Sequence, residues 1–330
     1  MKTLQFGIIG FGHFGKHYAR LLQEIPGVNL VTVANKSGDG FEKNKDVLSV
    51  GIKKTLKSDE VIKDKKIDCV IIATPPHTHK DLIIKSLRQG KHVFVEKPMV
   101  INTSEAKAIE KELSKNKNLV FMVGLQYVYN DYLRYIKEHI KDLGAVKYFM
   151  GEHLYGGPFR ADVGSFMDAG IHDCAVLEYL FSPGKIVKVT GASRSFKNSA
   201  NDDFASVTVK FQSGLVAHLL TSWYWPEKVR KVTLVGDKGM ALFNDRDDAK
   251  LRWINSSYPK WGKNKKSSLF LPNLMEQQSL PSVKAGEPLK NELEHFISCV
   301  STGSKPVTGI EFGARITKMM EEISKKIVKF

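Results

Sequence analysis

The chain of 330 residues is 42% hydrophobic and 26% charged, which excludes an intrinsically disordered protein and leaves room for two domains of ordinary size. Its formal net charge is +15, from 50 Lys and Arg against 35 Asp and Glu, but the excess is divided almost evenly, +8 within residues 1–123 and +7 beyond them. Because the charge is not concentrated and only nine of the 50 basic residues are Arg, we expect a diffuse lysine surface and no nucleic-acid partner.

In chain order, the first part of the sequence alternates short apolar runs with patterns of helical spacing. The apolar runs, which predict strands, are residues 4–9, 28–34, 68–73, 92–95 and 119–123. Helical patterns lie between them, for example after the glycines that follow residue 9 and after Asn102. Strands that alternate with helices indicate a Rossmann fold with a doubly wound parallel sheet, and we place this first domain at residues 1–123.

The pattern changes after Gly124. Period-two runs that indicate an antiparallel sheet are found at residues 204–211, 214–222 and 229–235, and helices are expected at about 168–181, 290–301 and 310–327. The second domain, residues 124–330, is therefore predicted to be α+β with a mainly antiparallel open sheet, and helix 310–327 is expected to pack back on the first domain. The polar stretch 255–268 is interpreted as a surface loop.

The three cysteines, Cys69, Cys174 and Cys299, are far apart and lack C-x-x-C spacing, so neither a disulfide framework nor a metal site is expected. The residues after Met1 lead directly into the first strand and leave no room for a signal peptide. No apolar run approaches the ~20 residues of a membrane span. We expect a cytoplasmic protein without membrane contact.

A glycine motif lies where the first strand is expected to end and the first helix to begin. It reads G-x-G-x-x-G and consists of Gly10, Phe11, Gly12, His13, Phe14 and Gly15. In this context the first glycine makes a tight turn, the second lets the backbone approach a pyrophosphate, and the third allows close packing of helix on strand. The N–H groups at the start of the helix also favour phosphate. The motif predicts a dinucleotide site.

The end of the second strand bears on the choice between NAD and NADP. NAD sites usually have Asp or Glu there to bind the ribose 2′-hydroxyl, whereas this chain has Asn35, Lys36 and Ser37. Lys36 would neutralise the 2′-phosphate of NADP, and Asn35 or Ser37 could donate hydrogen bonds to it, so NADP is preferred over NAD. The alternative is that Lys36 is an ordinary surface lysine and that Asp39 reaches a ribose hydroxyl.

Four segments together resemble the glucose–fructose oxidoreductase / inositol dehydrogenase (Gfo/Idh/MocA) family of NAD(P)-dependent oxidoreductases. They are the glycine motif, Ala73-Thr74-Pro75-Pro76-His77-Thr78-His79, Gly90-Lys91-His92-Val93-Phe94-Val95-Glu96-Lys97-Pro98, and Asp168-Ala169-Gly170-Ile171-His172. Their order and spacing match those of the family, closely over residues 1–124 and more loosely beyond. Near the C-terminus, residues 292–296 and 305–307 resemble the closing helix of the family and the turn after it.

The resemblance implies that Lys97 is the catalytic acid/base. It follows a strand at the carboxyl edge of the predicted sheet, where ligands of such folds bind, and Glu96 and Pro98 flank it. Interconversion of an alcohol and a carbonyl needs a group that takes or gives the hydroxyl proton, and a lysine can do this when its environment favours the neutral amine. Because the bond before this proline tends to be cis in relatives, we expect a non-helical turn at Lys97-Pro98.

Asp168 and His172 are the predicted catalytic partners of Lys97. They are four residues apart, so they would share a face if they lie on one helix. The resemblance implies that both bind substrate hydroxyls and assist Lys97, with His172 as a second candidate acid/base because imidazole titrates near neutrality. Arg160 and Asp162 lie in a loop where relatives place substrate contacts. The alternative for Asp168 and His172 is a helix-capping Asp and a packed His.

The resemblance extends the cofactor-binding set to Thr74, Pro75, His79, Glu96, Lys97 and Gln126. Two departures from the family pattern concern the substrate side: Gln126 and Tyr127 stand where many relatives have Arg, and Gly164 alone stands where many have several glycines. Trp223, Tyr224 and Trp225 could stack on a sugar, form a subunit interface or pack in the sheet.

These observations predict an NAD(P)-dependent oxidoreductase that interconverts a hydroxyl and a keto group on a sugar, a sugar derivative or a cyclitol. A homodimer or homotetramer through the C-terminal sheet is expected. The alternative from another functional class is a regulatory protein of the same fold that senses the dinucleotide without turnover. Retention of Lys97, Asp168 and His172 together argues against it, since a sensor has no need of an acid/base set.

Overall fold

The computed structural model describes residues 2–157, 159–196, 201–255 and 278–330. By its internal contacts the chain divides into two compact units. Unit 1 comprises Met1–Gln126 and Glu287–Glu321, and unit 2 comprises Tyr127–Gly286 and Glu322–Phe330. This division differs from the boundary predicted after residue 123 in that a C-terminal segment belongs to unit 1, and this segment includes most of the helix expected at 310–327 to pack on the first domain. The surface loop predicted at 255–268 lies, beyond Asn255, outside the described residues.

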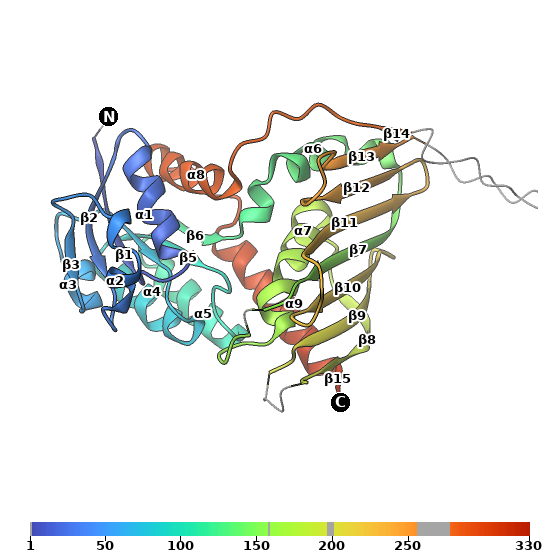
Figure 1. Cartoon of the computed structure of the whole chain (residues 1–330), viewed down its shortest axis with the longest axis horizontal. Helices are drawn as coiled ribbons and strands as arrows, with labels where there is room; N and C mark the ends of the chain where they lie inside the picture. Colours follow the sequence, from blue (N-terminus) through green and yellow to red (C-terminus); the bar gives the residue numbers. More distant parts are fainter. Residues whose placement is uncertain (1, 158, 197–200, 256–277) are drawn as a thin grey trace, which may run out of the picture. The chain divides into compact units, whose positions relative to one another are not determined.

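Unit 1 is built on six parallel strands in the order β3-β2-β1-β4-β5-β6 (Figure 1). The strands are β1 (Leu4–Ile9), β2 (Val28–Ala34), β3 (Lys53–Thr55), β4 (Cys69–Ile72), β5 (His92–Glu96) and β6 (Phe121–Gly124). Every side chain of β4 is fully buried, as expected for a strand with helices on both faces of its sheet. The strand order reverses between β1 and β4, which confirms the predicted doubly wound fold.

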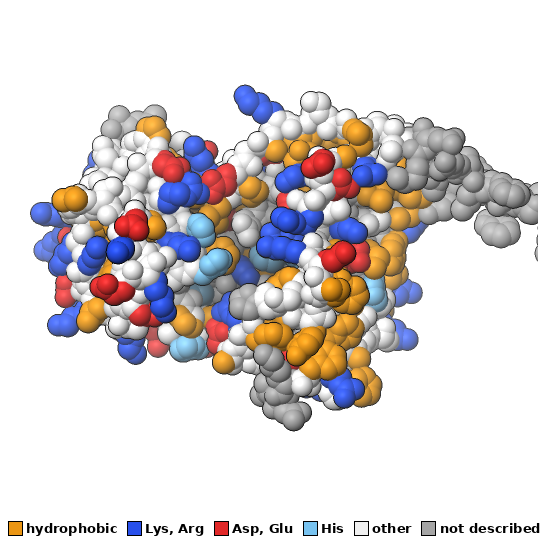
Figure 2. Space-filling model, in the orientation of Figure 1, with side chains coloured by type: hydrophobic (Ala, Val, Ile, Leu, Met, Phe, Trp, Pro, Cys, Tyr) orange, Lys and Arg blue, Asp and Glu red, His pale blue; other side chains and the backbone are white. Residues whose placement is uncertain are grey.

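Helices and short helical turns connect these strands. In unit 1 they are α1 (Gly15–Glu24), α2 (Asp39–Lys43), η1 (Lys45–Val47), α3 (Ser58–Ile62), η2 (Pro76–Thr78), α4 (His79–Arg88), α5 (Thr103–Leu113) and α8 (Pro288–Thr302), and α9 (Ile310–Lys326) has most of its length there. In the described part of the chain, no helix combines the length and apolarity needed to cross a membrane. On the face of unit 1 shown in Figure 2, Lys and Arg side chains lie scattered among Asp and Glu side chains.

Helix α8, which precedes the C-terminal helix α9, completes an aromatic cluster in unit 1. The ring of Phe296 lies 6.3 Å from that of Phe6 on β1 and 5.6 Å from that of Phe94 on β5, in both cases edge to face. Such pairs add about 1 kcal/mol to the burial of their rings. The segment after α8 is tied to β6, since the Thr308 hydroxyl donates to the Val123 carbonyl oxygen at 2.7 Å and the Val123 N–H donates back to Thr308.

Unit 2 is built on a nine-stranded sheet in the order β14-β13-β12-β11-β7-β10-β9-β8-β15 (Figure 1). The strands are β7 (Val146–Leu154), β8 (Ile186–Arg194), β9 (Phe204–Phe211), β10 (Val216–Ser222), β11 (Val229–Gly236), β12 (Met240–Asn244), β13 (Leu251–Ile254), β14 (Gln278–Ser279) and β15 (Val328–Lys329). Among these described strands, neighbours are antiparallel except β7 with β10 and β8 with β15, which confirms a mainly antiparallel sheet.

One face of this sheet is buried under helical segments and the other carries half-exposed side chains. The buried residues of β9 are those predicted from its period-two pattern, Ala205, Val207, Val209 and Phe211. The helical segments of unit 2 are η3 (Gln126–Tyr129), α6 (Asp131–His139), η4 (Ile140–Leu143), η5 (Phe166–Gly170) and α7 (Ile171–Phe181). Helix α7 is buried almost all round, and Gly151 on β7 makes room for Asp173, because a Cβ at Gly151 would lie 2.4 Å from its carboxyl carbon.

Candidate active site

The glycine turn between β1 and α1 is closed at two of its glycines and open at the third. Gly10 has φ +99°, and a Cβ on it would lie 2.3 Å from the carbonyl oxygen of Ala73. A Cβ on Gly15 would lie 2.0 Å from the carbonyl oxygen of Gly10. In contrast, a Cβ on exposed Gly12 would meet no atom within 4 Å. The turn therefore leaves space where a pyrophosphate would approach the backbone, so it fits a dinucleotide.

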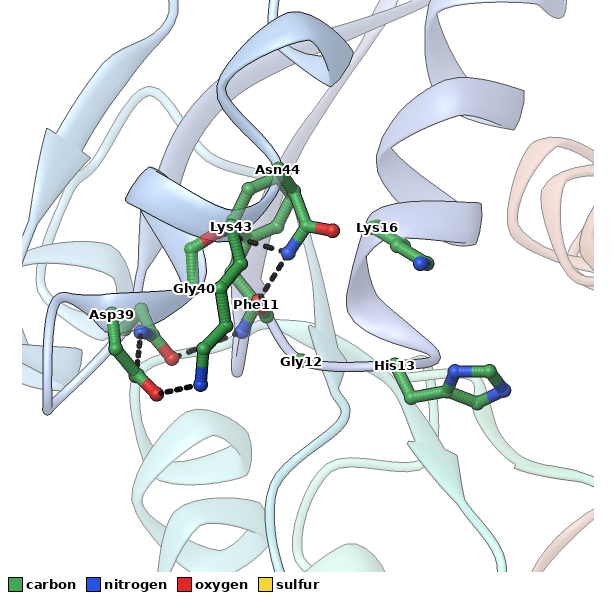
Figure 3. A pocket seen from close by; sticks show the side chains of 9 residues that line it. Phe11, Gly12, His13, Lys16, Asp39, Gly40, Lys43 and Asn44 are labelled. Atoms are coloured by element: carbon green, nitrogen blue, oxygen red, sulfur yellow. Dashed lines mark hydrogen bonds and ion pairs between the residues drawn. The ribbon is translucent and has the colours of Figure 1, made fainter.

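A pocket of about 390 Å³ lies beside this turn (Figure 3). It is lined by Phe11, Gly12, His13, Lys16, Asn35, Asp39, Gly40, Lys43 and Asn44. Phe11 is buried and packs on Phe41, whereas His13 is exposed and its ring contacts that of half-buried Phe14. The lining includes two lysines and one aspartate, so its formal charge is positive with His neutral, which suits phosphate groups.

Asp39 is the centre of a hydrogen-bonded group in this pocket (Figure 3). Its carboxylate accepts from the Ser37 hydroxyl, from Nζ of Lys43 at 2.9 Å and from the side-chain amide of Asn35 at 3.3 Å. These hydrogen bonds, that of Ser37 first, hold the pKa of Asp39 well below its usual range. The side-chain oxygen Oδ1 of Asn35 accepts the backbone N–H of Phe11 at 3.3 Å and so links this group to the glycine turn.

Lys36, the predicted selector of NADP, lies outside the pocket lining. It is exposed on a turn that closes with a hydrogen bond of 3.0 Å from the Gly38 N–H to the Asn35 carbonyl oxygen. Of the three residues singled out at the end of β2, the pocket takes in Asn35. The cations that line the pocket are Lys16 and Lys43, which the sequence did not single out because nothing in its pattern shows that α2 turns back toward the glycine turn.

The loop after β4 places Thr74 beside the glycine turn. A Cβ on Gly10 would lie 3.0 Å from Cγ2 of Thr74, and Pro75 is exposed. His79 was predicted to contact the cofactor, but its side chain is fully buried, with Nδ1 2.9 Å from the carbonyl oxygen of Pro98 and Nε2 2.8 Å from that of Thr74. His79 therefore joins two loops through their backbones, and burial lowers its pKa.

Lys97 directly follows β5 and is half-buried. The Lys97-Pro98 peptide bond is cis, and the two residues form a non-helical bend, as expected. Because β1, β4 and β5 are adjacent parallel strands, Gly10, Thr74 and Lys97 follow the carboxyl ends of neighbouring strands and lie along one edge of the sheet. Gln126 begins η3 just after β6, on the next strand along this edge.

Glu96, another predicted cofactor ligand, is buried and directed into unit 1. Its Oε1 accepts a hydrogen bond from the Tyr18 hydroxyl at 2.5 Å, and its Oε2 accepts the backbone N–H of Lys97 at 3.0 Å. Both carboxylate oxygens thus bind groups of the protein.

In unit 2, Asp168 lies in the π-helical turn η5 and is held by two donors. The Arg160 guanidinium donates to its Oδ1 at 2.9 Å, and the Tyr155 hydroxyl donates to its Oδ2 at 3.1 Å. Arg160 also pairs with Asp162 at 2.7 Å. Burial and the Asp168 charge raise the pKa of Tyr155, which keeps its hydroxyl a donor. The structure thus joins three predicted residues and adds Tyr155, which no sequence motif marked.

His172 lies in the first turn of α7, among buried polar side chains. Its ring packs 4.8 Å from the ring of Tyr127 and 5.6 Å from that of His153. Nδ1 of His153 lies 3.0 Å from the Asp173 carboxylate, which aligns the ring. The Tyr127 hydroxyl and Nε2 of His153 bind no other group in the described part of the chain. His153 was missed because its position in a strand carries no catalytic signal.

The three aromatic residues after β10 have different environments. Trp223 is 1% exposed and its indole N–H donates to the Tyr155 hydroxyl at 3.1 Å, so it belongs to the core of unit 2. Tyr224 and Trp225 are 54% and 41% exposed. Stacking on a sugar or contact with another subunit therefore remains an interpretation for these last two.

Comparison with known proteins gives matches over both units. Residues 4–125 match the family described as "Oxidoreductase family, NAD-binding Rossmann fold", and residues 134–242 match the "GFO/IDH/MocA C-terminal domain". A scyllo-inositol 2-dehydrogenase (NAD(+)) of Bacillus subtilis is 27% identical over 325 residues, which cover 91% of this chain and 87% of that protein.

Two further proteins show the range of names among the matches. A 2,7-anhydro-N-acetylneuraminate hydratase of Escherichia coli is 24% identical over 267 residues, 74% of this chain and 69% of the hydratase. The solved structure of a UDP-N-acetylglucosamine 3-dehydrogenase from Acidithiobacillus ferrooxidans superposes with a TM-score of 0.83 at 20% identity, over 99% of this chain and 98% of that one. This structural match concerns the fold alone.

Proposed function

The chain belongs to the Gfo/Idh/MocA family of NAD(P)-dependent oxidoreductases, and on that premise we propose that it interconverts a hydroxyl and a keto group on a sugar, a sugar derivative or a cyclitol. The observation that carries the proposal is the position of Lys97 at the carboxyl end of β5, separated from the glycine turn after β1 by β4 alone. The name of the inositol dehydrogenase relative supports the substrate class.

In this proposal Lys97 is the principal acid/base. A bound nicotinamide ring would supply the group that takes or gives a hydride. During oxidation Nζ of Lys97 accepts the proton of the substrate hydroxyl, and during reduction it returns that proton. The hydrogen bond from the Lys97 N–H to Glu96 holds the backbone from which this side chain projects.

In unit 2, Asp168 and His172 are the proposed substrate ligands. The Asp168 carboxylate is an acceptor for substrate hydroxyl groups, and Arg160 and Tyr155 orient it. His172 is a second acid/base candidate, and its ring packs against those of Tyr127 and His153. Because Arg160 is shared between Asp162 and Asp168, the group keeps a formal charge of −1, and its carboxylate oxygens suit an uncharged substrate whose hydroxyl groups donate hydrogen bonds.

We also propose NADP as the preferred cofactor. Lys16 and Lys43 give the pocket beside the glycine turn a positive lining, and exposed Lys36 lies on the turn next to pocket residue Asn35. Asp39 opposes this preference in principle, because a carboxylate repels a 2′-phosphate. Its charge is offset by Lys43 at 2.9 Å and by the donors of Asn35 and Ser37.

For assembly we propose a cytoplasmic homodimer or homotetramer formed through the sheet of unit 2. The face of that sheet opposite α7 carries half-buried apolar side chains on its central strands, among them Met150 on β7, Leu220 on β10 and Val235 on β11. A second copy of the chain would cover these side chains.

The test is incubation of the purified protein with NADP or NAD and a panel of sugars, cyclitols and keto sugars. We expect a change in the absorbance of reduced nicotinamide with at least one hydroxyl or keto substrate. Tight binding of the cofactor without turnover across a broad panel would support the sensing alternative. Addition or loss of water without net nicotinamide reduction, detected by mass spectrometry, would favour a second candidate, a hydratase like the Escherichia coli relative.

A further inference from the structure

Three buried polar side chains from distant parts of unit 1 meet behind Lys97. Tyr18 comes from α1, Glu96 from β5 and Glu292 from α8, and their exposed fractions are 0%, 7% and 1%. The Tyr18 hydroxyl oxygen lies 2.5 Å from Oε1 of Glu96 and 3.1 Å from Oε1 of Glu292. Oε2 of Glu96 accepts the backbone N–H of Lys97 at 3.0 Å. A chain of hydrogen bonds therefore leads from α8 to the Lys97 backbone.

The number of protons in this chain follows from its geometry. A tyrosine hydroxyl carries one hydrogen, so Tyr18 can donate to one carboxyl group only. Glu96 also accepts the Lys97 N–H at its Oε2, whereas Oε2 of Glu292 has no hydrogen-bond partner in the described structure, so Glu96 is the better acceptor and its shorter contact takes that hydrogen. The contact to Glu292 is then attractive only if Glu292 itself donates to the Tyr18 oxygen, which requires a protonated Glu292. Were both carboxyl groups ionised, a buried anionic oxygen would face a lone pair.

The surroundings of Glu292 favour the same assignment. Burial first, and then the charge of Glu96, raise its pKa well above the usual value, and they outweigh hydrogen bonds with Tyr18 and the Leu125 backbone, which lower it. Burial and the two glutamates also raise the pKa of Tyr18, so its hydroxyl remains a donor. Tyr18 from α1 and Glu96 from β5 are the titratable groups facing Glu292 in the described structure. In the described structure Oε2 of Glu292 has no hydrogen-bond partner. A buried oxygen without a partner costs a neutral carboxyl group much less free energy than it costs a carboxylate.

We propose that Glu292 is a positioning residue for Lys97: as a neutral acid it donates to Tyr18, Tyr18 donates to the Glu96 carboxylate, and this carboxylate holds the Lys97 N–H. The hydrogen bonds that Glu96 accepts from the Tyr18 hydroxyl and from the Lys97 N–H favour its ionised form and restrict the orientation of its carboxylate. Since the reaction step itself belongs to Lys97, the kinetic part of this inference rests on the proposed function, whereas the protonation of Glu292 does not.

The protonation state is tested by infrared spectroscopy on the purified protein at neutral pH. A protonated carboxyl group has a C=O band that shifts between H2O and D2O. We expect this band in the wild type and in Glu294→Gln, a matched control at an exposed position on the same helix, and its loss in Glu292→Gln. Absence of the band from the wild type, or its persistence in Glu292→Gln, would overturn the assignment.

The positioning role is tested by comparing two substitutions. Glu292→Gln keeps a donor to Tyr18, so kcat should stay within about threefold of the wild type, whereas Glu292→Leu removes the donor and should lower kcat about tenfold, with the Kd of the cofactor nearly unchanged. Equal kcat values for Glu292→Leu and the wild type, or an equal loss in both variants, would refute the role.

Two controls separate the possible failures. If Glu292→Leu does not fold, the infrared band and the kcat of Glu292→Gln still decide, because Gln matches the neutral acid in size. If Lys97→Ala keeps full activity, the proposed acid/base is wrong, whatever the infrared result for Glu292. If the infrared band is lost in Glu292→Gln and Lys97→Ala has normal activity, Glu292 is protonated as proposed. Its role as a positioning residue for a catalytic Lys97 is then refuted.

Discussion

Lys97 carries the proton in the proposed reaction, so its substitution should affect turnover more than cofactor binding. Lys97→Ala is expected to lower kcat by ~10²–10⁴, the usual contribution of a general acid/base, and to leave the Kd for NADPH nearly intact. Lys107→Ala, which removes an exposed lysine from α5, is the matched control and should behave as the wild type. Fluorescence titration with NADPH and steady-state rates measure the two quantities. Normal turnover by Lys97→Ala would exclude the mechanism.

The preference between NADPH and NADH should depend on Lys36. Lys36→Glu places a negative charge beside the proposed 2′-phosphate position and should lower the ratio of kcat/KM for NADPH over NADH by about tenfold. Lys45→Glu, the same charge change at an exposed site on η1, should leave the ratio unchanged. An unaltered ratio in Lys36→Glu would remove Lys36 as the selector and direct attention to Lys16 and Lys43 in the pocket.

At the scale of residues, sequence predicts contacts that are local and misses those that are not. Asp168 and Arg160 are eight residues apart, in segments that the family resemblance marks, and the structure joins them. Tyr18 and Glu292 are 274 residues apart, and each alone has the pattern of an ordinary helix residue. His153 is likewise an unremarkable residue of a strand until α7 brings Asp173 against it. Groups that orient other residues through such long-range contacts can be identified only once the fold is known.

At the scale of elements, the pairing of β5 with β6 should depend on pH through His92. Its Nδ1 accepts the backbone N–H of Val120 at 3.0 Å, which only a neutral ring can do, and burial lowers its pKa. The unfolded chain takes up the proton at about pH 6.5, so this stabilisation is complete above that pH and is lost as the pH falls below it.

Replacement of His92 should therefore flatten the acid side of the stability profile. In His92→Asn a side-chain carbonyl oxygen can accept the Val120 N–H at any pH. Melting temperatures between pH 8 and pH 5 should fall less in this variant than in the wild type, by an amount corresponding to about 1 kcal/mol for one hydrogen bond. Parallel profiles for the two proteins would show that His92 does not contribute to the pH dependence.

Element patterns were predicted well where one physical rule dominates. The alternation in β9 follows from a sheet with one buried face, and the apolar run of β4 follows from burial on both faces. Where a single helix was expected at 168–181, the structure has a π-helical turn over Phe166–Gly170, and the α-helix α7 begins only at Ile171. Hydrophobic spacing does not distinguish these two helical geometries, because the segment is buried almost all round.

At the scale of the whole molecule, the proposed assembly predicts that a charged substitution on the sheet of unit 2 changes the oligomeric state. Leu220 is half-buried on the central strand β10, and Leu220→Glu would place a charge in the proposed interface. We expect this variant to be monomeric in light scattering coupled to gel filtration, whereas Lys107→Glu, on exposed α5, should keep the size of the wild type. A wild-type monomer, or an unchanged size for Leu220→Glu, would contradict this interface.

The fold class could be predicted from the sequence, and the helix at 310–327 was expected to pack on the first domain, whereas the return of the segment before that helix was not expected. Alternating strands and helices followed by period-two strands predicted a parallel sheet and a mainly antiparallel sheet, and both are present. A single boundary after residue 123 was the simplest division of that pattern. The return of Glu287–Glu321 to unit 1 depends on particular contacts, those of Phe296 with Phe94 and of Thr308 with Val123, which no periodicity records.

Because Glu287–Glu321 belongs to unit 1, folding of this unit cannot be completed until late in the synthesis of the chain. During synthesis the strands of unit 1 emerge first, but the ring of Phe296 and the carboxyl group of Glu292 emerge only after nearly all of unit 2. Until then Phe6, Phe94 and Tyr18 lack partners that they have in the finished protein. Unit 1 is therefore incomplete until the residues between Gln126 and Phe296 have been synthesised. During that time chaperones can bind the apolar surface that α8 later covers.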